Sequence, residues 1–348
     1  MAKSRVAGRA RGTRARLAET AVSSWSELTD LLYADSWAEP LGRFRSRYVF
    51  RGEAASPLEL ATSLQELGEG ATAVEPHLLR NFRQFAEPDA ALGDSTWNWL
   101  VLAQHHGLPT RLLDWTFSPY VALHFATELP SPAAGDGVVW CVDFRAAHRR
   151  LPQAFRRALE RESADLFTTE MLAALAPGVR DLTRRRGRPF VAFFHPPSLD
   201  ERVRNQFSVF SIASDARLRM RDWVREEPGL ARRIVVPARL KWEIRDKLDQ
   251  ANITERVLFP GLDGLARWLA RYYAPRPHGA NPRAPADDRP IPLAAEIGQV
   301  GIRRSAHSNR TSAKTPSAWS SRRPGTGETS SRSTPRGGAP RRSRRPTR

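Results

Sequence analysis

The chain has 348 residues, enough for one large domain or two small ones, and 41% of them are hydrophobic, as expected of a globular protein. Its formal net charge of +18 comes from the two ends, residues 1–17 and 276–348, because residues 18–275 contain 33 basic and 33 acidic side chains. The composition therefore excludes a folded surface that is basic throughout, and any affinity for phosphate polymers is expected to belong to the tails.

The sequence gives no sign of secretion or membrane insertion. Its single cysteine, Cys141, lies in an apolar run and is expected to be a buried, unreactive thiol. The basic N-terminus lacks the apolar centre of a signal peptide, and no stretch of 18 apolar residues exists. We therefore expect a cytoplasmic protein without a membrane span, whose oligomeric state the sequence does not indicate.

Three segments follow from the pattern of residues. Residues 1–20 are predicted to form a basic arm that frays or becomes helical only near Ala18. Residues 21–274 contain the helical and strand-like patterns and are predicted to form the folded domain. Residues 275–348 are dominated by Arg, Ser, Pro, Gly and Thr, so we expect a disordered tail. Such a tail is either a solvated extension without a partner or a non-specific contact for RNA or DNA.

The first predicted elements lead to an arginine at the end of a strand. Ser24 and Glu27 have the spacing of a helix capping box. Residues 48–50 form a short β-rich run that ends at Arg51-Gly52. A strand-end arginine beside a glycine that permits close approach of the backbone suits an anion or a phosphate, although an ordinary surface arginine fits as well. We therefore take Arg51 and Gly52 as candidate site residues.

The later elements indicate the fold class. Residues 111–115 read as a strand, and Ser118-Pro119 as an N-cap followed by proline at the first helical position. Helices are also predicted at 75–86, 95–104, 151–175, 239–250 and 262–273, and strands at 137–144, 190–194, 207–212 and 232–236. Without a regular βαβ repeat, this mixture predicts an α+β fold: a single domain with a small, mainly antiparallel or mixed sheet packed by helices.

Polar side chains are concentrated between Trp97 and Pro119, within sequence that otherwise looks like core. Because polar groups in apolar surroundings must find partners, they form either a buried network or a binding site. No phosphate-binding glycine loop and no nucleophile elbow accompanies them. The candidate ligand-binding residues of this segment are Gln104, His105, His106, Arg111 and Asp114.

Each of these candidates has a structural alternative. For His105 and His106 three roles are open. They bind a metal, although no metal-binding motif accompanies them. They bind substrate or transfer a proton, or else one is buried against the backbone and the other lies at the edge of the site. Arg111 and Asp114 either form an ion pair or point to opposite faces of a strand and need separate partners. Ser118 needs no role beyond capping its helix, which contributes about 1 kcal/mol.

Several strings resemble the FRG domain family. Residues 48–53 contain the Phe-Arg-Gly string that names the family, and residues 104–116 resemble its central motif. Residues 118–126 and 258–266 also fit, as does a Q-x-x-x-F element that begins at Gln206 and has Phe207 where glycine is expected. The resemblance covers about residues 22–273 and implies little chemistry by itself.

A second resemblance, to ADP-ribosyltransferases of the Arg-Ser-Glu type, implies more. It would make Arg51 the residue that holds a phosphate or ribose of NAD, and Thr116 or Ser118 the residue that orders the nicotinamide pocket. Those enzymes place a glutamate on a later strand. Here Gln206 stands nearest that position and carries no charge, so Glu201, five residues earlier, is the alternative.

Three hypotheses remain open. The first is an NAD-consuming enzyme without a metal, an ADP-ribosyltransferase or NAD glycohydrolase that acts in bacterial conflict or phage defence. The second is a non-catalytic module that recognises a nucleotide or a protein partner. The third is a nucleic-acid-associated protein whose affinity comes from the basic tail, residues 276–348.

Overall fold

The computed structural model describes residues 17–55, 59–86, 95–128, 135–185, 187–227 and 229–274. These residues all belong to one compact unit that spans Met1–Ala284. The predicted disordered tail and nearly all of the predicted basic arm lie outside the described residues. Within the described ranges, no helix is long and apolar enough to cross a membrane.

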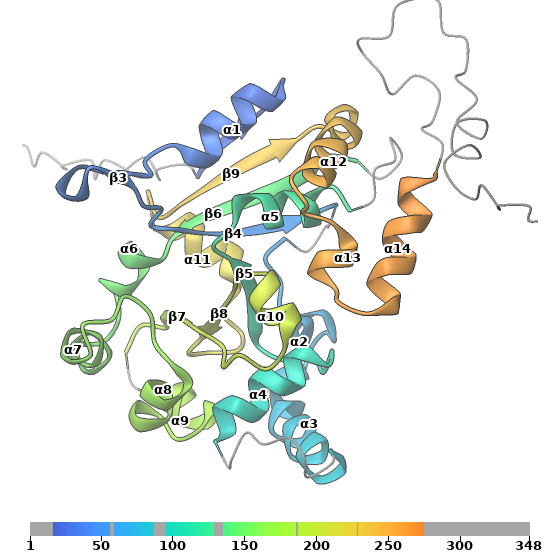
Figure 1. Cartoon of the computed structure of the whole chain (residues 1–348). Coiled ribbons are helices and arrows are strands. Elements are labelled where there is room, and N and C mark those ends of the chain that lie inside the picture. Colours follow the sequence, from blue (N-terminus) through green and yellow to red (C-terminus); the bar gives the residue numbers. More distant parts are fainter. Residues whose placement is uncertain are drawn as a thin grey trace, which may run out of the picture. The chain divides into compact units, whose positions relative to one another are not determined.

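A mixed sheet forms the centre of the domain (Figure 1). Its seven strands lie in the order β1-β9-β6-β4-β5-β8-β7, and all neighbours are antiparallel except β1 and β9. The strands are β1 (Ala18–Ala21), β4 (Tyr48–Glu53), β5 (Leu112–Thr116), β6 (Gly137–Asp143), β7 (Val191–Phe194), β8 (Ser208–Ala213) and β9 (Ala231–Val236). A separate hairpin joins β2 (Trp37–Ala38) to β3 (Arg43–Phe44). The predicted α+β fold is confirmed.

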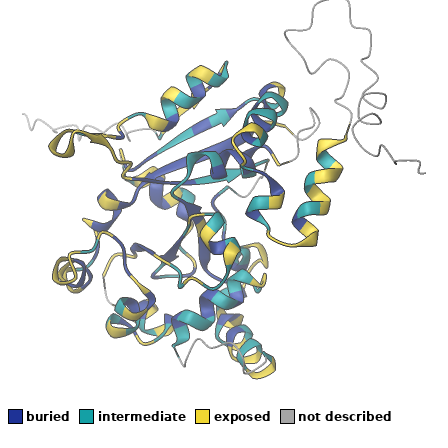
Figure 2. Cartoon of the chain, viewed as in Figure 1, coloured by how far each residue is buried: buried dark blue, intermediate teal, exposed yellow. Residues whose placement is uncertain are grey.

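Helices surround this sheet, with their exposed faces outward (Figure 2). They are α1 (Trp25–Tyr33), α2 (Ser63–Glu66), α3 (Ala71–Phe85), α4 (Thr96–His105), α5 (Pro119–Ala126), α6 (Phe144–His148), α7 (Gln153–Arg161), α8 (Thr169–Leu175), α9 (Val179–Thr183), α10 (Glu201–Asn205), α11 (Met220–Glu226), α12 (Lys241–Gln250), α13 (Glu255–Leu258) and α14 (Leu262–Tyr272), with 3-10 turns η1 (Glu39–Leu41) and η3 (Ala238–Leu240).

Three hydrophobic clusters divide the sheet between them. One cluster runs under strands from both halves of the sheet, from Trp140 on β6 to Phe193 on β7, and includes α6 and α11. On the opposite face, α1, α5 and α12 cover β4, β6 and β9. The helices α3, α4, α7, α8 and α9 cover β5, β7 and β8 on that same face. The covering helices therefore part where β4 meets β5.

Most of the local predictions are confirmed. The Ser24 hydroxyl accepts a hydrogen bond from the backbone N–H of Glu27, and the Ser118 hydroxyl accepts one from Val121. Both serines therefore cap the helices that follow them. Cys141 is buried, and burial raises the pKa of its thiol to about 11, as expected of an unreactive cysteine.

Two local predictions are wrong. Ala18–Ala21 neither frays nor becomes helical, because its backbone pairs in parallel with β9 and forms an edge strand of the sheet. Residues 151–175 do not form one helix. Ser163 adopts a positive φ of 50°, Phe167 bridges to Phe194 on β7, and Thr168 caps a new helix, α8. Pairing with the sheet thus overrides the local helical pattern.

Gly52 allows α5 to pack directly on β4. A Cβ atom at this position would lie 1.7 Å from the carbonyl oxygen of Ala122 and 2.6 Å from the backbone nitrogen of Ala126. The sequence analysis expected an anion to approach the backbone closely at Gly52. In the structure the backbone of α5 makes that approach instead, on the side of β4 that carries Phe50.

Substitution Gly52→Ala is expected to lower the free energy of unfolding by about 3 kcal/mol, because neither backbone can move away without breaking its own hydrogen bonds. Denaturant unfolding followed by circular dichroism measures the effect. The control is Gly178→Ala, where the added Cβ would meet its nearest atom only at 3.7 Å and the cost should stay near about 1 kcal/mol. Equal losses in the two variants would contradict the proposed packing role.

Candidate functional site

The sheet opens between β4 and β5. In these two fully described strands, the only paired residues are Phe50 and Thr116. Beyond that pair the antiparallel register would continue with Arg51 opposite Trp115, but the ladder stops. A side chain spans the opening instead, because Nη1 of Arg51 donates to the carbonyl oxygen of Asp114 at 2.9 Å.

A cavity of about 410 Å³ occupies this opening. It lies where the two groups of helices part, so residues of both groups line it. Its lining residues come from separate parts of the chain, including β4, α4, β5, α5 and the segment around α10. The polar residues in its lining are Arg51, Glu53, Glu66, Gln104, His105, Asp114, Thr116, Glu128, Arg202, Gln206 and Ser208.

Arg51 and Glu53 form a fixed pair on one wall. Residues two apart on a strand share a face, and Nε of Arg51 donates to Oε1 of Glu53 at 3.0 Å. The Glu53 carboxylate also accepts from the backbone N–H of Leu60 at 3.1 Å and from Nε1 of Trp140 at 3.2 Å. With the carbonyl of Asp114 on its other side, the Arg51 guanidinium is held in place from two directions.

Asp114 is the single carboxylate on the facing strand, β5. It is exposed, whereas the other four residues of β5 are buried, so its side chain points out of the packed sheet into the cavity. Its Oδ2 accepts from Nε2 of Gln104 at 2.8 Å, and Oε1 of Gln104 accepts from the Thr110 hydroxyl at 2.6 Å. The Gln104 amide is thus oriented by Thr110 and presents its N–H group to Asp114.

Thr116 and Gln206 join three elements at the closed end of the opening. The Thr116 hydroxyl donates to the backbone carbonyl of Gln206 at 2.7 Å and accepts from the backbone N–H of Ser118 at 3.0 Å. The Gln206 side chain donates to the carbonyl of Leu258 at 2.9 Å. Gln206 therefore ties α10 to α13 through its amide, a bond that a glutamate could not donate.

Phe207 explains why the sequence pattern expects glycine after Gln206. Its φ is +49°, in the left-handed region that glycine adopts at little cost. Its side chain is 59% exposed, so no core packing compensates the strain. A strained, exposed aromatic residue next to the cavity is typical of a functional site.

His105 lies between the cavity and a second hollow of about 420 Å³. Its Nε2 donates to Oδ2 of Asp200 at 2.7 Å. Burial lowers the pKa of His105, and the attraction of Asp200 opposes this effect without reversing it. The imidazole is therefore neutral near pH 7, and with its proton on Nε2 it has Nδ1 as an acceptor.

The second hollow is bordered by two arginines that lie over one aromatic ring. The guanidinium carbons of Arg202 and Arg267 lie 5.1 and 4.6 Å from the centre of the Phe259 ring. Arg202 lines both hollows, as His105 does. The two hollows therefore share a border.

Six of the residues singled out in the sequence meet in the main cavity with Gly52: Arg51, Gln104, His105, Asp114, Thr116 and Gln206. Four others do not line it. Ser118 caps α5, and His106 is an exposed residue at the end of α4. Glu201 lines the second hollow. Arg111 is buried, and its guanidinium binds the Glu75 carboxylate, Thr183 and the carbonyl of Ser214.

Arg111 and Asp114 therefore do not pair with each other, and the alternative in which each has its own partner is confirmed. Sequence reasoning also missed several carboxylates of the site, Glu53, Glu66, Glu128 and Asp200. Glu53 stands in the same string as Arg51, and the two-residue period of a strand was a signal that could have found it. Asp200 lies far along the chain from His105, and no local pattern connects them.

The comparison with protein families supports one part of this interpretation. Residues 46–134 match the family model of the FRG domain. The chain contains an FRG domain. The matched segment includes β4, α4, β5 and α5, so both strands of the opening belong to the FRG domain, whereas α10 and α13 follow it. No curated protein and no solved structure matches the chain. The likeness to ADP-ribosyltransferases remains a hypothesis.

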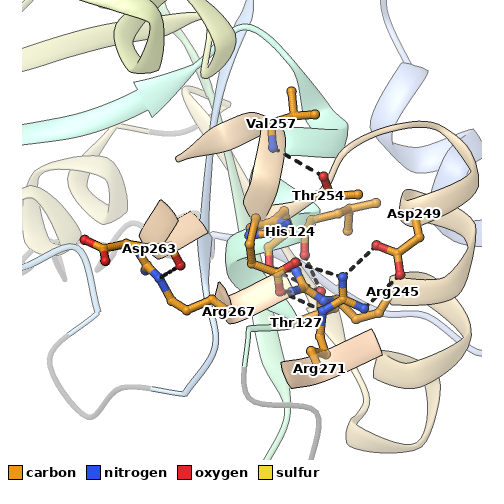
Figure 3. Close-up of polar contacts among 11 residues, drawn as sticks. His124, Thr127, Arg245, Asp249, Thr254, Val257, Asp263, Arg267 and Arg271 are labelled. Carbon is orange, nitrogen blue, oxygen red and sulfur yellow. Dashed lines mark hydrogen bonds and ion pairs between the residues drawn. The ribbon is translucent and has the colours of Figure 1, made fainter. Parts of the chain in front are cut away.

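A buried ion cluster anchors the helices that follow the FRG domain. Figure 3 shows the guanidiniums of Arg245 and Arg271 close together, with Asp249 beside Arg271. Arg271 binds Asp249 at 2.6 Å and Glu255 at 2.6 Å, and Arg245 binds Glu255 and the carbonyl of His124. The cluster joins α12, α13 and α14 to α5, one of the walls of the cavity.

The charges of this cluster hold Glu255 in its ionised form. Burial alone would raise the pKa of Glu255, but the hydrogen bonds from Arg271 and the positive charge of Arg245 outweigh it and lower the pKa to about 2. The His124 ring is buried beside them. Burial, and then the charge of Arg245, lower the pKa of His124 to about 3 and keep the ring neutral.

Glu255→Gln is expected to lower the free energy of unfolding by about 3 to 5 kcal/mol at pH 7, because it leaves two buried guanidiniums short of a counter-charge. The folded pKa of Glu255 is depressed, so its stabilisation is complete above pH 4.5 and is lost as the pH falls towards 2. Urea unfolding should therefore show a smaller difference between wild type and variant at pH 3.5 than at pH 7.

The matched control is Glu243→Gln, which removes an exposed pair with Lys247 at the usual i,i+4 spacing. This variant should lower the free energy of unfolding by less than about 0.5 kcal/mol. A Glu255→Gln variant no less stable than this control, or a difference from wild type that grows as the pH falls, would contradict the role given to the cluster.

Proposed function

We propose that the FRG-domain cavity binds NAD and that the chain consumes it, as an ADP-ribosyltransferase or an NAD glycohydrolase. One observation carries the proposal. The opening between β4 and β5 places the guanidinium of Arg51 and the carboxylates of Glu53 and Asp114 in one cavity, on two facing strands. NAD carries both an anionic diphosphate and a cationic nicotinamide, so a cavity with fixed charges of both signs suits it.

Arg51 is the residue that would hold the diphosphate. Its Nε and Nη1 are engaged by Glu53 and by the carbonyl of Asp114, and Nη2 has no recorded partner among the described residues. The two engaged nitrogens fix the plane of the guanidinium, so its remaining N–H groups point in a set direction. Such a preorganised group binds phosphate oxygens with little loss of entropy.

Asp114 is the residue that would face the ribose. NAD supplies a glycosidic bond between C1′ of the ribose and the nicotinamide nitrogen, and breaking it leaves positive charge on the ribose. A fixed carboxylate stabilises that charge, as carboxylates do in glycoside hydrolysis. Because Gln206 carries no charge and its amide is bound to Leu258, Asp114 takes the role that the resemblance gives to a later glutamate.

The neutral His105 would serve the second half of the reaction. Its Nδ1 is an acceptor at the border of the cavity, where it can take the proton from water or from the hydroxyl of an acceptor as that group adds to C1′. Consumption of NAD by this route suits an effector in bacterial conflict, including phage defence.

A second function is favoured by the bond between Gln206 and Leu258. An uncharged side chain that is held by a structural hydrogen bond, at the position of the expected glutamate, suits a module that recognises a nucleotide without cleaving it. This alternative makes the same prediction for binding and the opposite one for turnover.

The test uses the full chain, with NAD binding measured by calorimetry and nicotinamide release by chromatography. Arg51→Ala is expected to weaken NAD binding about 10- to 100-fold, as the loss of a charged hydrogen-bond donor does. Asp114→Asn should lower nicotinamide release about 100-fold or more while changing binding only a few-fold. Arg51→Lys should restore part of the binding, because it keeps the charge and loses the fork.

The control is Arg47→Ala, which removes a half-exposed arginine that pairs with Asp143 outside the cavity. Its binding of NAD should match that of wild type. Binding without release by the wild-type chain would select the recognition module. A folded chain that does not bind NAD, or that binds it equally with and without Arg51, would overturn the proposal.

A further inference from the structure

Two arginine-rich segments stand out in a domain whose total charge is balanced. Residues 144–161 contain six arginines and one acidic residue, and residues 180–188 contain five arginines and one acidic residue. An excess of acidic residues lies in residues 52–75, which contain five glutamates and no basic residue. The charges of the neutral body are therefore unevenly distributed along the chain, and α6, α7 and the end of α9 carry a local excess of basic residues.

The fold brings these two segments together. The guanidinium carbon of Arg185, just after α9, lies 4.9 Å from the centre of the Phe155 ring on α7. Arg150 and Arg188, one from each segment, bind the two oxygens of the same carboxylate, Glu227, at 2.9 and 3.0 Å. In Figure 1, α6, α7, α8 and α9 lie on the same side of the sheet's centre, away from α13 and α14. The two segments are thus neighbours, and we call the surface formed by their described arginines the basic face.

Many of these arginines are exposed and have no recorded counter-charge. Arg145, Arg150 and Arg188 are paired with carboxylates. Arg185 donates to the carbonyl of Leu175. Among the described residues, no hydrogen bond or ion pair of the side chain is found for the remaining exposed arginines of the face. These are Arg149, Arg156, Arg157, Arg161, Arg180 and Arg184. Like charges held close together without partners repel each other, and a polyanion relieves that repulsion.

A hollow of about 330 Å³ between α6 and α7 lies within this face. Arg149 and Arg156 line it, together with one unpaired carboxylate, Glu160, and the pair formed by Arg145 and Asp165. His148 also lines it, but both its ring nitrogens are engaged, with the carbonyl of Asp165 and the backbone N–H of Phe193. Arg149, Arg156 and Glu160 are therefore the charged groups available to a ligand, and two of the three are cationic.

We infer that this basic face binds the phosphate backbone of a nucleic acid duplex, independently of the NAD site. None of the exposed large hydrophobic side chains of the described residues lies in 144–161 or 180–188, so the face offers no aromatic platform for unstacked bases and no apolar wedge for a bilayer. Its contacts are to phosphates, and the binding is independent of base sequence.

The experiment compares two triple variants in the full chain, so that the basic tail is the same in both. Arg149→Gln, Arg156→Gln and Arg157→Gln are combined in the first. Arg43→Gln, Arg204→Gln and Arg239→Gln, three exposed arginines outside the face, are combined in the second. Affinity for a labelled 20-base-pair DNA duplex of mixed sequence is measured by fluorescence anisotropy over a range of potassium chloride concentrations, after thermal melting has shown that both variants fold.

The slope of log affinity against log salt should become shallower by about 2 to 3 in the first variant, because each phosphate contact contributes about 0.9. In the second variant this slope should change by less than about 1. Equal slopes in the two variants would overturn the inference and assign the binding to the tail. Loss of binding to phosphatidylserine vesicles in the first variant, without loss of duplex binding, would also overturn it.

Discussion

The hydrogen bond from Arg51 to the carbonyl of Asp114 is the contact on which the site depends. It spans the point where β4 and β5 stop pairing, and thereby keeps the two strands at a fixed separation without closing the gap. Neither strand is free to move: Gly52 locks β4 against the backbone of α5, and β5 continues its ladder with β8. Unpaired backbone groups in the opening would otherwise be unfavourable. The opening instead becomes a rigid cavity with two guanidiniums, Arg51 and Arg202, and several carboxylates in its walls.

The distribution of hydrophobic residues explains why the gap does not split the domain. On one face a single cluster continues under strands of both halves and holds them in one sheet. On the other face the helices belong to two clusters that part at β4 and β5. Burial therefore supplies a continuous floor and a divided cover. Gln104, Asp114 and Thr116 lie where the cover divides, whereas Arg51 and Glu53 share the face of β4 that carries Val49, a residue of the continuous cluster.

The sequence predicted those parts of this arrangement that depend on local patterns. The caps at Ser24 and Ser118 follow from short-range hydrogen bonding. Gln104 and Asp114 were singled out by their polarity within core sequence, and Arg51 by its place at a strand end beside glycine, and all three line the cavity. Contacts between segments far apart in the chain could not be predicted from local patterns. Arg111 binds Glu75 rather than a neighbour, and Asp200 reaches His105 only because α10 folds over α4. The edge strand β1 was missed for the same reason, since its partner, β9, comes late in the chain.

The balance of charge in the body hides an arrangement that matters for function. Equal numbers of acidic and basic residues in 18–275 indicate a surface without a net field, yet the glutamates of 52–75 and the arginines of 144–161 lie on different elements. Two of those glutamates, Glu53 and Glu66, line the cavity. A dipolar distribution of this kind orients a charged partner over distances of about one Debye length, roughly 8 to 10 Å. Net charge alone therefore decides little about what a folded domain binds, because separation of the charges sets the local potential at each face.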